Sequence, residues 1–294
     1  MRLEGTDVRI SGATRVCGIV GDPIEHSLSP AMQNAAFESA GLDYVYVPFR
    51  LPRGATGVVA DAARTLGFRG LNVTVPHKVD IMAYLDSVDS EAVAIGAVNT
   101  IVNDGGHLRG YNTDAWGFAE GLKARGLQVR GRDVVVLGAG GAARAVVFTL
   151  VSLGAMVAIL NRDAGRAESL ARDASALGGA AVAHGPLVDA VLESRLAGAS
   201  LLVNTTSVGM TPLRDATPCP LRFLRPDMAV CDIVYNPRPT LLLRDAASVG
   251  APTVDGVEML VQQGARAFEL WTGESAPVAL MRDVATRELD RASH

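Results

Sequence analysis

Short apolar runs alternate with amphipathic segments through the first part of the chain. The apolar runs predict strands over residues 15–20, 44–49 and 71–75. Apolar residues at helical spacing predict helices over residues 30–40 and 56–66. Two more strands, over 98–103 and 107–111, are separated by Asp-Gly-Gly and are expected to form a hairpin. Strands that alternate with helices are typical of parallel βαβ units.

A second run of alternating elements follows. It opens with an expected helix over 114–125, with Thr113 or Asp114 as its N-cap. The expected strands cover residues 133–137, 156–160, 180–183, 201–204, 229–232 and 252–254. From Gly256 onward the pattern is almost entirely helical, with breaks at Gly273 and Pro277. This last segment is too short to be a domain, so we expect it to pack on the first one.

The pattern therefore predicts an α/β protein with two α/β domains, and 294 residues agree with that number. The expected N-terminal domain covers residues 1–113 and is completed by C-terminal helices over 255–294. Residues 114–254 are expected to form a Rossmann-like dinucleotide-binding domain. The apolar stretch 134–160 is interrupted by Gly138, Gly140 and Arg144, which indicates a strand, turn, helix and strand rather than a membrane span.

Composition and charge exclude several classes of protein. With 49% hydrophobic and 20% charged residues, the chain is neither disordered nor fibrous. A net charge of −4 provides no basic field for nucleic acid. Three cysteines without a Cys-x-x-Cys pair argue against disulfides and structural zinc, and no metal is expected. The N-terminal segment lacks the apolar core of a secretory signal, so we expect a cytoplasmic protein.

A dinucleotide-binding fingerprint occupies the centre of the chain. The apolar strand 133–137 is followed at once by Gly138, Gly140 and Ala143 and then by a helical pattern. The first glycine permits the tight turn, the second lets backbone approach a pyrophosphate, and the alanine allows close helix packing. The N-terminus of the helix then offers free N–H groups and a favourable dipole to the anion.

The residues that follow the next strand bear on the choice of cofactor. Arg162 and Arg166 can hold the 2′-phosphate of NADP, because guanidinium groups match phosphate oxygens bidentately. Asp163 favours NAD instead, since its carboxylate repels that phosphate and can bind a free ribose hydroxyl. The sequence favours NADP and leaves NAD as the alternative.

Polar side chains gather in four segments of the first domain, GDPIEHSLSP, GLNVTVPHK, GAVNT and GYNTD. They lie after or beside apolar strands, at the sheet ends where open α/β sheets bind ligands. The candidates for contacts with a polyhydroxylated substrate are Ser27, Ser29, Thr74, Asn99 and Asn112.

These segments resemble the shikimate dehydrogenase family, including its quinate/shikimate dehydrogenase branch. The resemblance covers the blocks 21–34, 70–78, 96–100, 110–118, 138–145, 204–210, 232–243 and 255–273, among them GDPIEHSLSPAMQN, GLNVTVPHK, GYNTDAWGF and GAGGAARA. Blocks in this order span almost the whole chain. Two positions depart from the common pattern, because Gln33 stands where many members have His and Asp163 where NADP-dependent members often have Thr or Ser.

The resemblance implies a role for each matching residue. It assigns the substrate carboxylate to Ser27, Ser29 and Tyr235, and the ring hydroxyls to Thr74, Asn99 and Gln263. It identifies Lys78 and Asp114 as the catalytic pair. The residues that it places around the cofactor are Gly138, Ala139, Gly140, Gly141, Ala142, Asn161, Arg162, Met210 and Gly256, and Arg166 joins them from the charge argument above.

The implied reaction is the reversible, NADP-dependent reduction of 3-dehydroshikimate to shikimate in aromatic amino acid biosynthesis, by a monomer or a homodimer. Lys78 acts either as the proton donor or only as an orienting charge. One alternative is a quinate/shikimate dehydrogenase that uses NAD, which Gln33 and Asp163 favour. The other is a sensor that binds shikimate or quinate without turnover, against which the intact Lys78 and Asp114 argue.

Lysine usage strengthens the assignment of Lys78. Only Lys78 and Lys123 among the 27 basic residues are lysines, so each is a candidate for a role that arginine cannot fill. Lys123 lies on a helical segment that is expected to be exposed. His26 and His77 are interpreted as bystanders or packing residues, and Trp116 and Trp271 as core residues.

Overall fold

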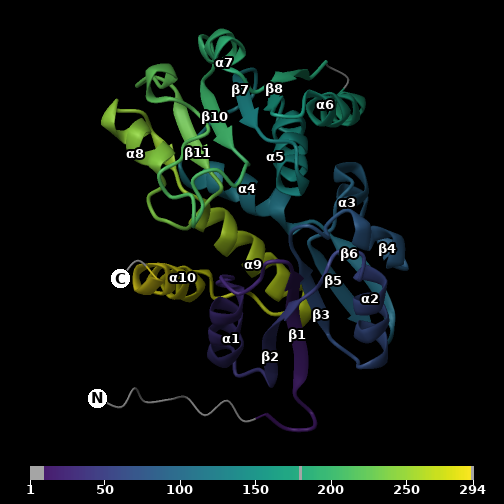
Figure 1. Cartoon of the computed structure of the whole chain (residues 1–294). Coiled ribbons are helices and arrows are strands. Elements are labelled where there is room, and N and C mark those ends of the chain that lie inside the picture. Colours follow the sequence, from purple (N-terminus) through teal and green to yellow (C-terminus); the bar gives the residue numbers. More distant parts are fainter. Residues whose placement is uncertain (1–9, 179–180, 293–294) are drawn as a thin grey trace.

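The computed structural model describes residues 10–178 and 181–292, which form two six-stranded sheets flanked by helices (Figure 1). The strands of the first sheet lie in the order β2 (Tyr44–Arg50), β1 (Arg15–Gly21), β3 (Gly70–Val73), β5 (Thr100–Asp104), β6 (His107–Tyr111) and β4 (Ser87–Val88). β1 pairs in parallel with β2 and β3, whereas β5 is antiparallel to both β3 and β6. The expected hairpin over β5 and β6 is confirmed, and the sheet is mixed rather than purely parallel.

The second sheet is parallel throughout and Rossmann-like. Its strands lie in the order β12 (Thr253–Val254), β11 (Ala229–Asp232), β10 (Leu201–Asn204), β7 (Asp133–Leu137), β8 (Met156–Asn161) and β9 (Ala183–Pro186). From β7 the chain first adds β8 and β9 on one side of the sheet and then β10, β11 and β12 on the other, so the strand order reverses between β7 and β10. The carboxyl ends of these two strands therefore border the crevice where open parallel sheets bind their ligands.

The continuous apolar run of β7 is explained by helices on both faces of this sheet. Val134 and Val136 point into one core cluster, and Val135 and Leu137 point into another. Side chains of a strand alternate between the two faces of the sheet, so every position of a strand that is covered on both faces is buried and apolar. Burial on both faces therefore fixes where β7 ends and where the following glycine turn begins.

The helices connect these strands. The α-helices are α1 (Ser29–Ser39), α2 (Thr56–Thr65), α3 (Ser90–Ile95), α4 (Thr113–Ala124), α5 (Gly141–Ser152), α6 (Ala164–Gly178), α7 (Asp189–Leu196), α8 (Leu241–Ser248), α9 (Gly256–Thr272) and α10 (Val278–Ala292). Two 3₁₀ turns cover Asp80–Tyr84 and Leu221–Phe223.

The last two helices pack against the first sheet, as expected. α9 lies along α4, and α10 lies beside α1, although more than 200 residues separate these last two in sequence (Figure 1). Trp271 of α9 is fully buried, and its indole N–H donates to the carbonyl oxygen of Ile101 in β5 at 2.9 Å. Residues Met32 and Phe37 of α1 share one core cluster with Trp271 and Met281.

Several local expectations are corrected by the structure. The strand expected over 180–183 is β9 at Ala183–Pro186, and residues 179–180 lie outside the described residues. The short elements β4 and α3 were missed, because two strand residues and one and a half helical turns give no periodic signal. Trp271 is a core residue, but Trp116 is 48% exposed with Arg266 over its ring, because it lies on the outer face of α4.

None of the helices over residues 10–178 and 181–292 combines the length and the apolar content that crossing a bilayer requires.

Candidate active site

Asp114 is placed by the first turn of α4, and the cap of this helix differs from the expectation. The N-cap is Asn112, whose side-chain oxygen accepts the backbone N–H groups of Asp114 and Ala115 at 3.1 and 3.2 Å. Neither Thr113 nor Asp114 caps the helix, because both have already entered its first turn. Since Asn112 satisfies the backbone donors, the carboxylate of Asp114 is left for other partners.

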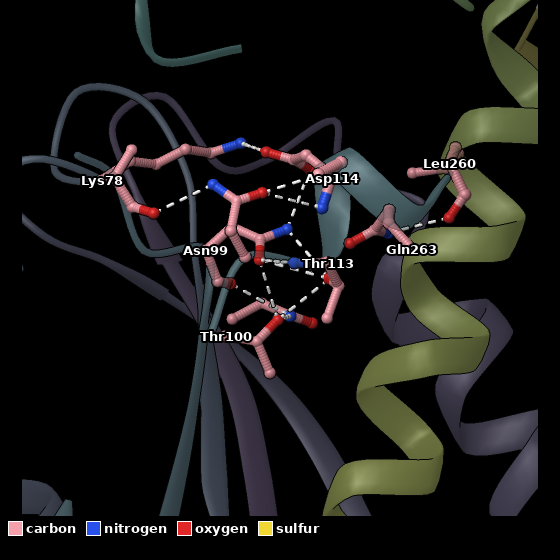
Figure 2. Close-up of polar contacts among 11 residues, drawn as sticks. Lys78, Asn99, Thr100, Thr113, Asp114, Leu260 and Gln263 are labelled. Carbon is pink, nitrogen blue, oxygen red and sulfur yellow. Dashed lines mark hydrogen bonds and ion pairs between the residues drawn. The ribbon is translucent and has the colours of Figure 1, made fainter. Parts of the chain in front are cut away.

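Those partners are Lys78 and Asn99. Lys78 follows β3 and its Nζ lies 2.5 Å from Asp114 Oδ2, while Asn99 Nδ2 donates to Asp114 Oδ1 at 2.8 Å (Figure 2). The side chains of Lys78 and Asp114 are only 12% and 8% exposed. Because both side chains are largely buried, this ion pair differs from a surface salt bridge, which contributes little free energy, and salt screens its charges only weakly. The structure therefore brings together the two residues expected to form the catalytic pair.

A buried hydroxyl network fixes the amide of Asn99 behind this pair. The Asn99 Oδ1 accepts the Thr113 backbone N–H at 2.7 Å and the Thr100 hydroxyl at 3.1 Å, and Thr100 and Thr113 share a further hydrogen bond of 3.1 Å (Figure 2). All three residues are buried. Thr100 and Thr113 were missed as site residues. Both belong to the polar segments GAVNT and GYNTD, in which each stands directly beside a candidate residue, and that position was the signal that could have identified them.

The remaining substrate candidates lie on segments around this pair. Ser27 and Ser29 occupy the entry to α1, where the Ser29 backbone N–H donates to Ser27 Oγ at 3.3 Å and Ser29 is 5% exposed. Thr74 follows β3 directly. A Cβ at Gly21 would lie 2.3 Å from Thr74 Cγ2, so the absence of a side chain there lets the ends of β1 and β3 approach.

Gln263 and Tyr235 come from later in the chain. Gln263 lies on α9 facing the first turn of α4 (Figure 2), and its Nε2 donates to the Leu260 carbonyl at 2.8 Å. The Gln263 Oε1 accepts no hydrogen bond from any of the described residues, which leaves an acceptor for a hydroxyl. Tyr235 follows β11, and burial raises the pKa of its phenol, so the hydroxyl keeps its proton and remains a donor.

The glycine turn after β7 has the geometry of a pyrophosphate cradle. Gly138 has a φ of +110°, and a Cβ there would lie 2.6 Å from Thr205 Oγ1, so glycine is required. Gly140 is the N-cap of α5, and no side chain caps this helix. A Cβ at Gly140 would meet nothing within 4 Å. The first N–H groups of α5, those of Gly141 and Ala142, therefore have no side-chain cap, which is the arrangement that binds an anion at a helix N-terminus.

The expected catalytic lysine lies against this cradle. A Cβ built at Gly141 would be 3.5 Å from Lys78 Cδ and 3.6 Å from Lys78 Cβ. The lysine, which belongs to the first sheet's side of the molecule, thus passes directly over the start of α5. The Lys78–Asp114 pair and the glycine turn therefore lie side by side.

The residues expected at the adenosine end run from the end of β8 into the start of α6. Arg162 is exposed and makes no hydrogen bond or ion pair with the residues described. Asp163 accepts the backbone N–H groups of Gly165 and Arg166 at 3.0 and 3.3 Å, and its other oxygen lies 3.5 Å from the Arg166 guanidinium. Asp163 therefore caps α6. Asn161, the last residue of β8, donates to the Asp163 carbonyl at 3.0 Å.

Met210 lies in the loop after β10, and Gly256 lies after β12 at the start of α9. Met210 is 43% exposed. Gly256 begins α9, and a Cβ there would lie 2.3 Å from the Ile233 carbonyl oxygen, so the close approach of helix and loop requires glycine. Sequence reasoning missed Asn204 and Asp232, which end β10 and β11, pair with each other in the sheet and have no exposed surface. A polar residue directly after each apolar strand was the signal.

The two histidines take no part in the pair. His77 is fully buried, and its Nε2 lies 2.7 Å from the Leu51 carbonyl oxygen, whereas His26 is exposed. Gln33 is also fully buried, with its Nε2 donating to the Gly264 carbonyl of α9 at 2.8 Å. The arrangement as a whole offers a proton-donating ammonium, a carboxylate to hold it, and an anion cradle beside both.

Known proteins resemble this chain over almost its whole length. Residues 19–101 match the profile of the shikimate dehydrogenase substrate binding domain, and residues 256–286 match the shikimate 5'-dehydrogenase C-terminal domain. A shikimate dehydrogenase (NADP(+)) of Moorella thermoacetica is 45% identical over 287 residues, which cover 97% of both chains.

Solved structures show the same likeness. A crystal structure of a shikimate dehydrogenase in complex with NADP+ superposes with a TM-score of 0.90 at 41% identity, covering 96% of this chain and 98% of the other. The quinate dehydrogenase from Corynebacterium glutamicum in complex with NAD gives a TM-score of 0.86 at 34% identity, covering 93% of this chain and 99% of the other.

Proposed function

The chain belongs to the shikimate dehydrogenase family, and on that premise we propose that it is an NADP-dependent oxidoreductase that interconverts 3-dehydroshikimate and shikimate. The observation that carries this proposal is the contact of Lys78 with both Asp114 and the Gly141 end of the glycine turn. It joins a proton donor to a dinucleotide cradle. That combination suits the reduction of a ketone.

The mechanism derives from this pair. When bound, NADPH supplies the hydride. As the C3 carbonyl of 3-dehydroshikimate is reduced, negative charge grows on its oxygen, and the Lys78 ammonium stabilises that charge and donates the proton. The Asp114 carboxylate holds the ammonium in place and is itself held by Asn99. In the reverse direction Lys78 receives the proton of the shikimate hydroxyl.

Substrate orientation falls to the polar residues around the pair. We assign the carboxylate of the substrate to Ser27, Ser29 and Tyr235, and its ring hydroxyls to Thr74, Asn99 and Gln263. The free acceptor of Gln263 and the protonated phenol of Tyr235 support these assignments.

The cofactor is assigned to the loops of the parallel sheet. The pyrophosphate lies on the segment Gly138–Ala142, the adenosine ribose end on Asn161, Arg162 and Arg166, and the nicotinamide near Met210 and Gly256. Asp163 is engaged in capping α6. Its carboxylate therefore has a structural role that does not depend on a free ribose hydroxyl, and the unpartnered Arg162 supports NADP.

Domain division and cellular setting follow the same reasoning. We place the substrate domain at residues 1–113 with 255–294, and the NADP-binding domain at 114–254; the packing of α9 and α10 on the first sheet supports this division. All three cysteines are buried free thiols, which supports a reducing cytoplasm. We propose a monomer or a homodimer, which sedimentation velocity distinguishes.

The deciding experiment is a two-by-two assay of the purified enzyme, with shikimate or quinate against NADP or NAD, comparing kcat/KM. We expect the highest value for shikimate with NADP. Quinate carries one more hydroxyl on a saturated ring, so a pocket shaped for shikimate discriminates against it. Equal or higher kcat/KM with quinate and NAD would favour the second candidate, a quinate/shikimate dehydrogenase, which the likeness to the NAD-bound quinate dehydrogenase makes worth testing. Binding without turnover of any pair would identify a sensor.

A further inference from the structure

Asp232 is a buried carboxylate that no step of the mechanism uses. It ends β11, has no exposed surface, and lies opposite Asn204, the last residue of β10, at the carboxyl edge of the parallel sheet. Three donors converge on it. Asn204 Nδ2 and the Val234 backbone N–H reach Oδ1 at 2.9 and 3.0 Å, and the Thr240 hydroxyl reaches Oδ2 at 2.7 Å.

The first donor governs the segment 205–211, which carries Met210. Asn204 Oδ1 accepts both the backbone N–H and the hydroxyl of Thr206, at 3.0 and 2.7 Å, and Asn204 Nδ2 also reaches the Val208 carbonyl at 3.3 Å. The orientation of one amide group therefore fixes the turn of this segment. Asp232 in turn fixes that orientation, because only the Nδ2 side of an amide can donate to a carboxylate.

The other two donors frame the segment 233–239, which carries Tyr235. Val234 is its second residue, and Thr240 closes it as the N-cap of α8, accepting the Leu243 backbone N–H at 3.3 Å. The two segments also meet directly, since the Thr211 backbone N–H donates to the Asn236 carbonyl at 3.2 Å. The Asp232 carboxylate thus binds residues at the start of both segments, through Asn204 and Val234, and at the end of the second, through Thr240.

The hydrogen bonds around Asp232 suit its charged form, and that form is costly to bury. Asn204 Nδ2 and the Val234 N–H can only donate, and the Thr240 hydroxyl donates as well when the carboxylate is ionised. Burial nevertheless raises the pKa of Asp232 to about 6, with no charged group among the causes. A group that costs folding stability in its working form is expected where geometry matters for function.

We propose that Asp232 is a positioning residue for hydride transfer, which holds the segments 205–211 and 233–239 in one relative placement and thereby sets Met210 and Tyr235 at the reacting site. The inference rests on the proposed function. Asp232 touches neither substrate nor cofactor in this scheme. It acts through Asn204 and Thr240.

The test is Asp232→Asn in the full-length enzyme. Asn keeps the shape and one acceptor but turns the other oxygen into a donor that faces Thr240. We expect kcat to fall about tenfold, the KM values for shikimate and NADP to rise, and the primary isotope effect with deuterated NADPH to change, all at a temperature well below the melting temperature of the variant. A purely structural role would lower the melting temperature and leave kcat, both KM values and the isotope effect unchanged.

A second set of variants keeps the inference testable if Asp232→Asn does not fold. Thr240→Val removes the hydroxyl that Asp232 binds, and Thr240→Ser restores it, so the first is expected to reproduce the kinetic defect and the second to recover at least half of the activity. Thr149→Val is the matched control, because the Thr149 hydroxyl is buried in α5 and finds no hydrogen-bond partner among the described residues.

The outcomes separate the two hypotheses. Wild-type enzyme without turnover of any substrate pair overturns the proposed function and this inference with it. Active wild type with kinetically normal Asp232→Asn, or with normal Thr240→Val where Asp232→Asn is unfolded, overturns the inference alone.

Discussion

The guanidinium of Arg144 donates a hydrogen bond to the carbonyl oxygen of Ile95, which joins α5 of the parallel sheet to the end of α3 on the first sheet. Arg144 also pairs with Asp173 at 3.0 Å and lies over the Phe148 ring. Gly96, which follows the last residue of α3, has a φ of +70°, and a Cβ there would be 2.7 Å from the Arg144 guanidinium. One arginine therefore links the two sides of the site from behind the glycine turn.

Loss of this link is expected to weaken both stability and catalysis. Arg144→Met keeps an apolar stem on Phe148 but leaves the Ile95 carbonyl without its donor, at a cost of about 1–3 kcal/mol. Urea unfolding measures this loss, and kcat/KM should fall because the two sheets no longer meet at a fixed distance. Arg172→Met, on the exposed face of α6, is the control and should change neither quantity. Normal values for Arg144→Met would show that the link is dispensable.

Lys78→Arg is expected to fold and to bind NADP but to lose on the order of 10²-fold in kcat. A guanidinium does not release its proton at working pH, whereas an ammonium exchanges one in each turnover. Lys123→Arg provides the control, because Lys123 is 76% exposed and pairs only with Glu120 one turn away. The measurement is kcat for both variants, with circular dichroism as a check on folding. Retained kcat in Lys78→Arg would make Lys78 an orienting charge and leave proton donation to water.

Ser29→Ala is expected to raise the KM for shikimate and leave the KM for NADP unchanged. A substrate carboxylate that loses one buried donor is destabilised by about 1–3 kcal/mol, or about 5- to 150-fold in binding. Ser39→Ala, at the exposed end of the same helix, is the matched control. A lower melting temperature with normal KM would instead identify Ser29 as a residue that only shapes the start of α1.

Arg162→Ala is expected to shift the cofactor preference toward NAD. If its guanidinium binds the 2′-phosphate, the variant loses about 1.5–3 kcal/mol of NADP binding and little of NAD binding. The ratio of kcat/KM values for the two cofactors measures this. Arg166→Ala should have a smaller effect, because Asp163 already pairs with that guanidinium. An unchanged ratio in Arg162→Ala would remove this residue from the cofactor site.

The pH dependence of stability is expected to reveal the charge on Asp232. Its pKa in the folded chain is about 6, above its ordinary value of 3.8, so between these values the native state binds more protons than the unfolded state. The contribution of Asp232 to stability therefore falls as pH rises from about 4 to about 6, by up to about 3 kcal/mol. Asp232→Asn lacks this loss.

Denaturant unfolding of both proteins from pH 4 to pH 7 measures the effect. The free energy of unfolding of Asp232→Asn minus that of wild type should rise across the range and then level off. Asp61→Asn is the control, because that carboxylate is 84% exposed and should give a flat difference. A flat difference for Asp232→Asn as well would show that its pKa is not raised by folding.

Sequence patterns predicted the long elements of this fold and missed the elements that tertiary contacts impose. Strands such as Asp133–Leu137 are buried on both faces, so their apolar runs are unambiguous. β4 forms only because Ser87 and Val88 pair with β6, which no local pattern announces. The cap of α4 was misjudged because three polar residues stand in a row, and only the extended backbone of Asn112 decides among them.

The site shows a similar division. Motifs and resemblance pointed to Lys78 and Asp114, which the structure brings within 2.5 Å. Thr100 and Asp232 were missed because their roles depend on partners that only folding brings near, Thr113 for Thr100 and Asn204 for Asp232. The capping role of Asp163 was hidden for another reason, because a carboxylate at that position serves equally well as a ribose ligand or as a helix cap.

The return of α9 and α10 to the first sheet orders events during synthesis on the ribosome. The parallel sheet is made from one continuous stretch and can close soon after β12 emerges. The core of the first sheet forms later, because one of its faces lacks Trp271 and Met281 until α9 and α10 have left the exit tunnel. The strands made first are thus among the last to be covered, and this half is the one exposed to chaperones and proteases while the nascent chain grows.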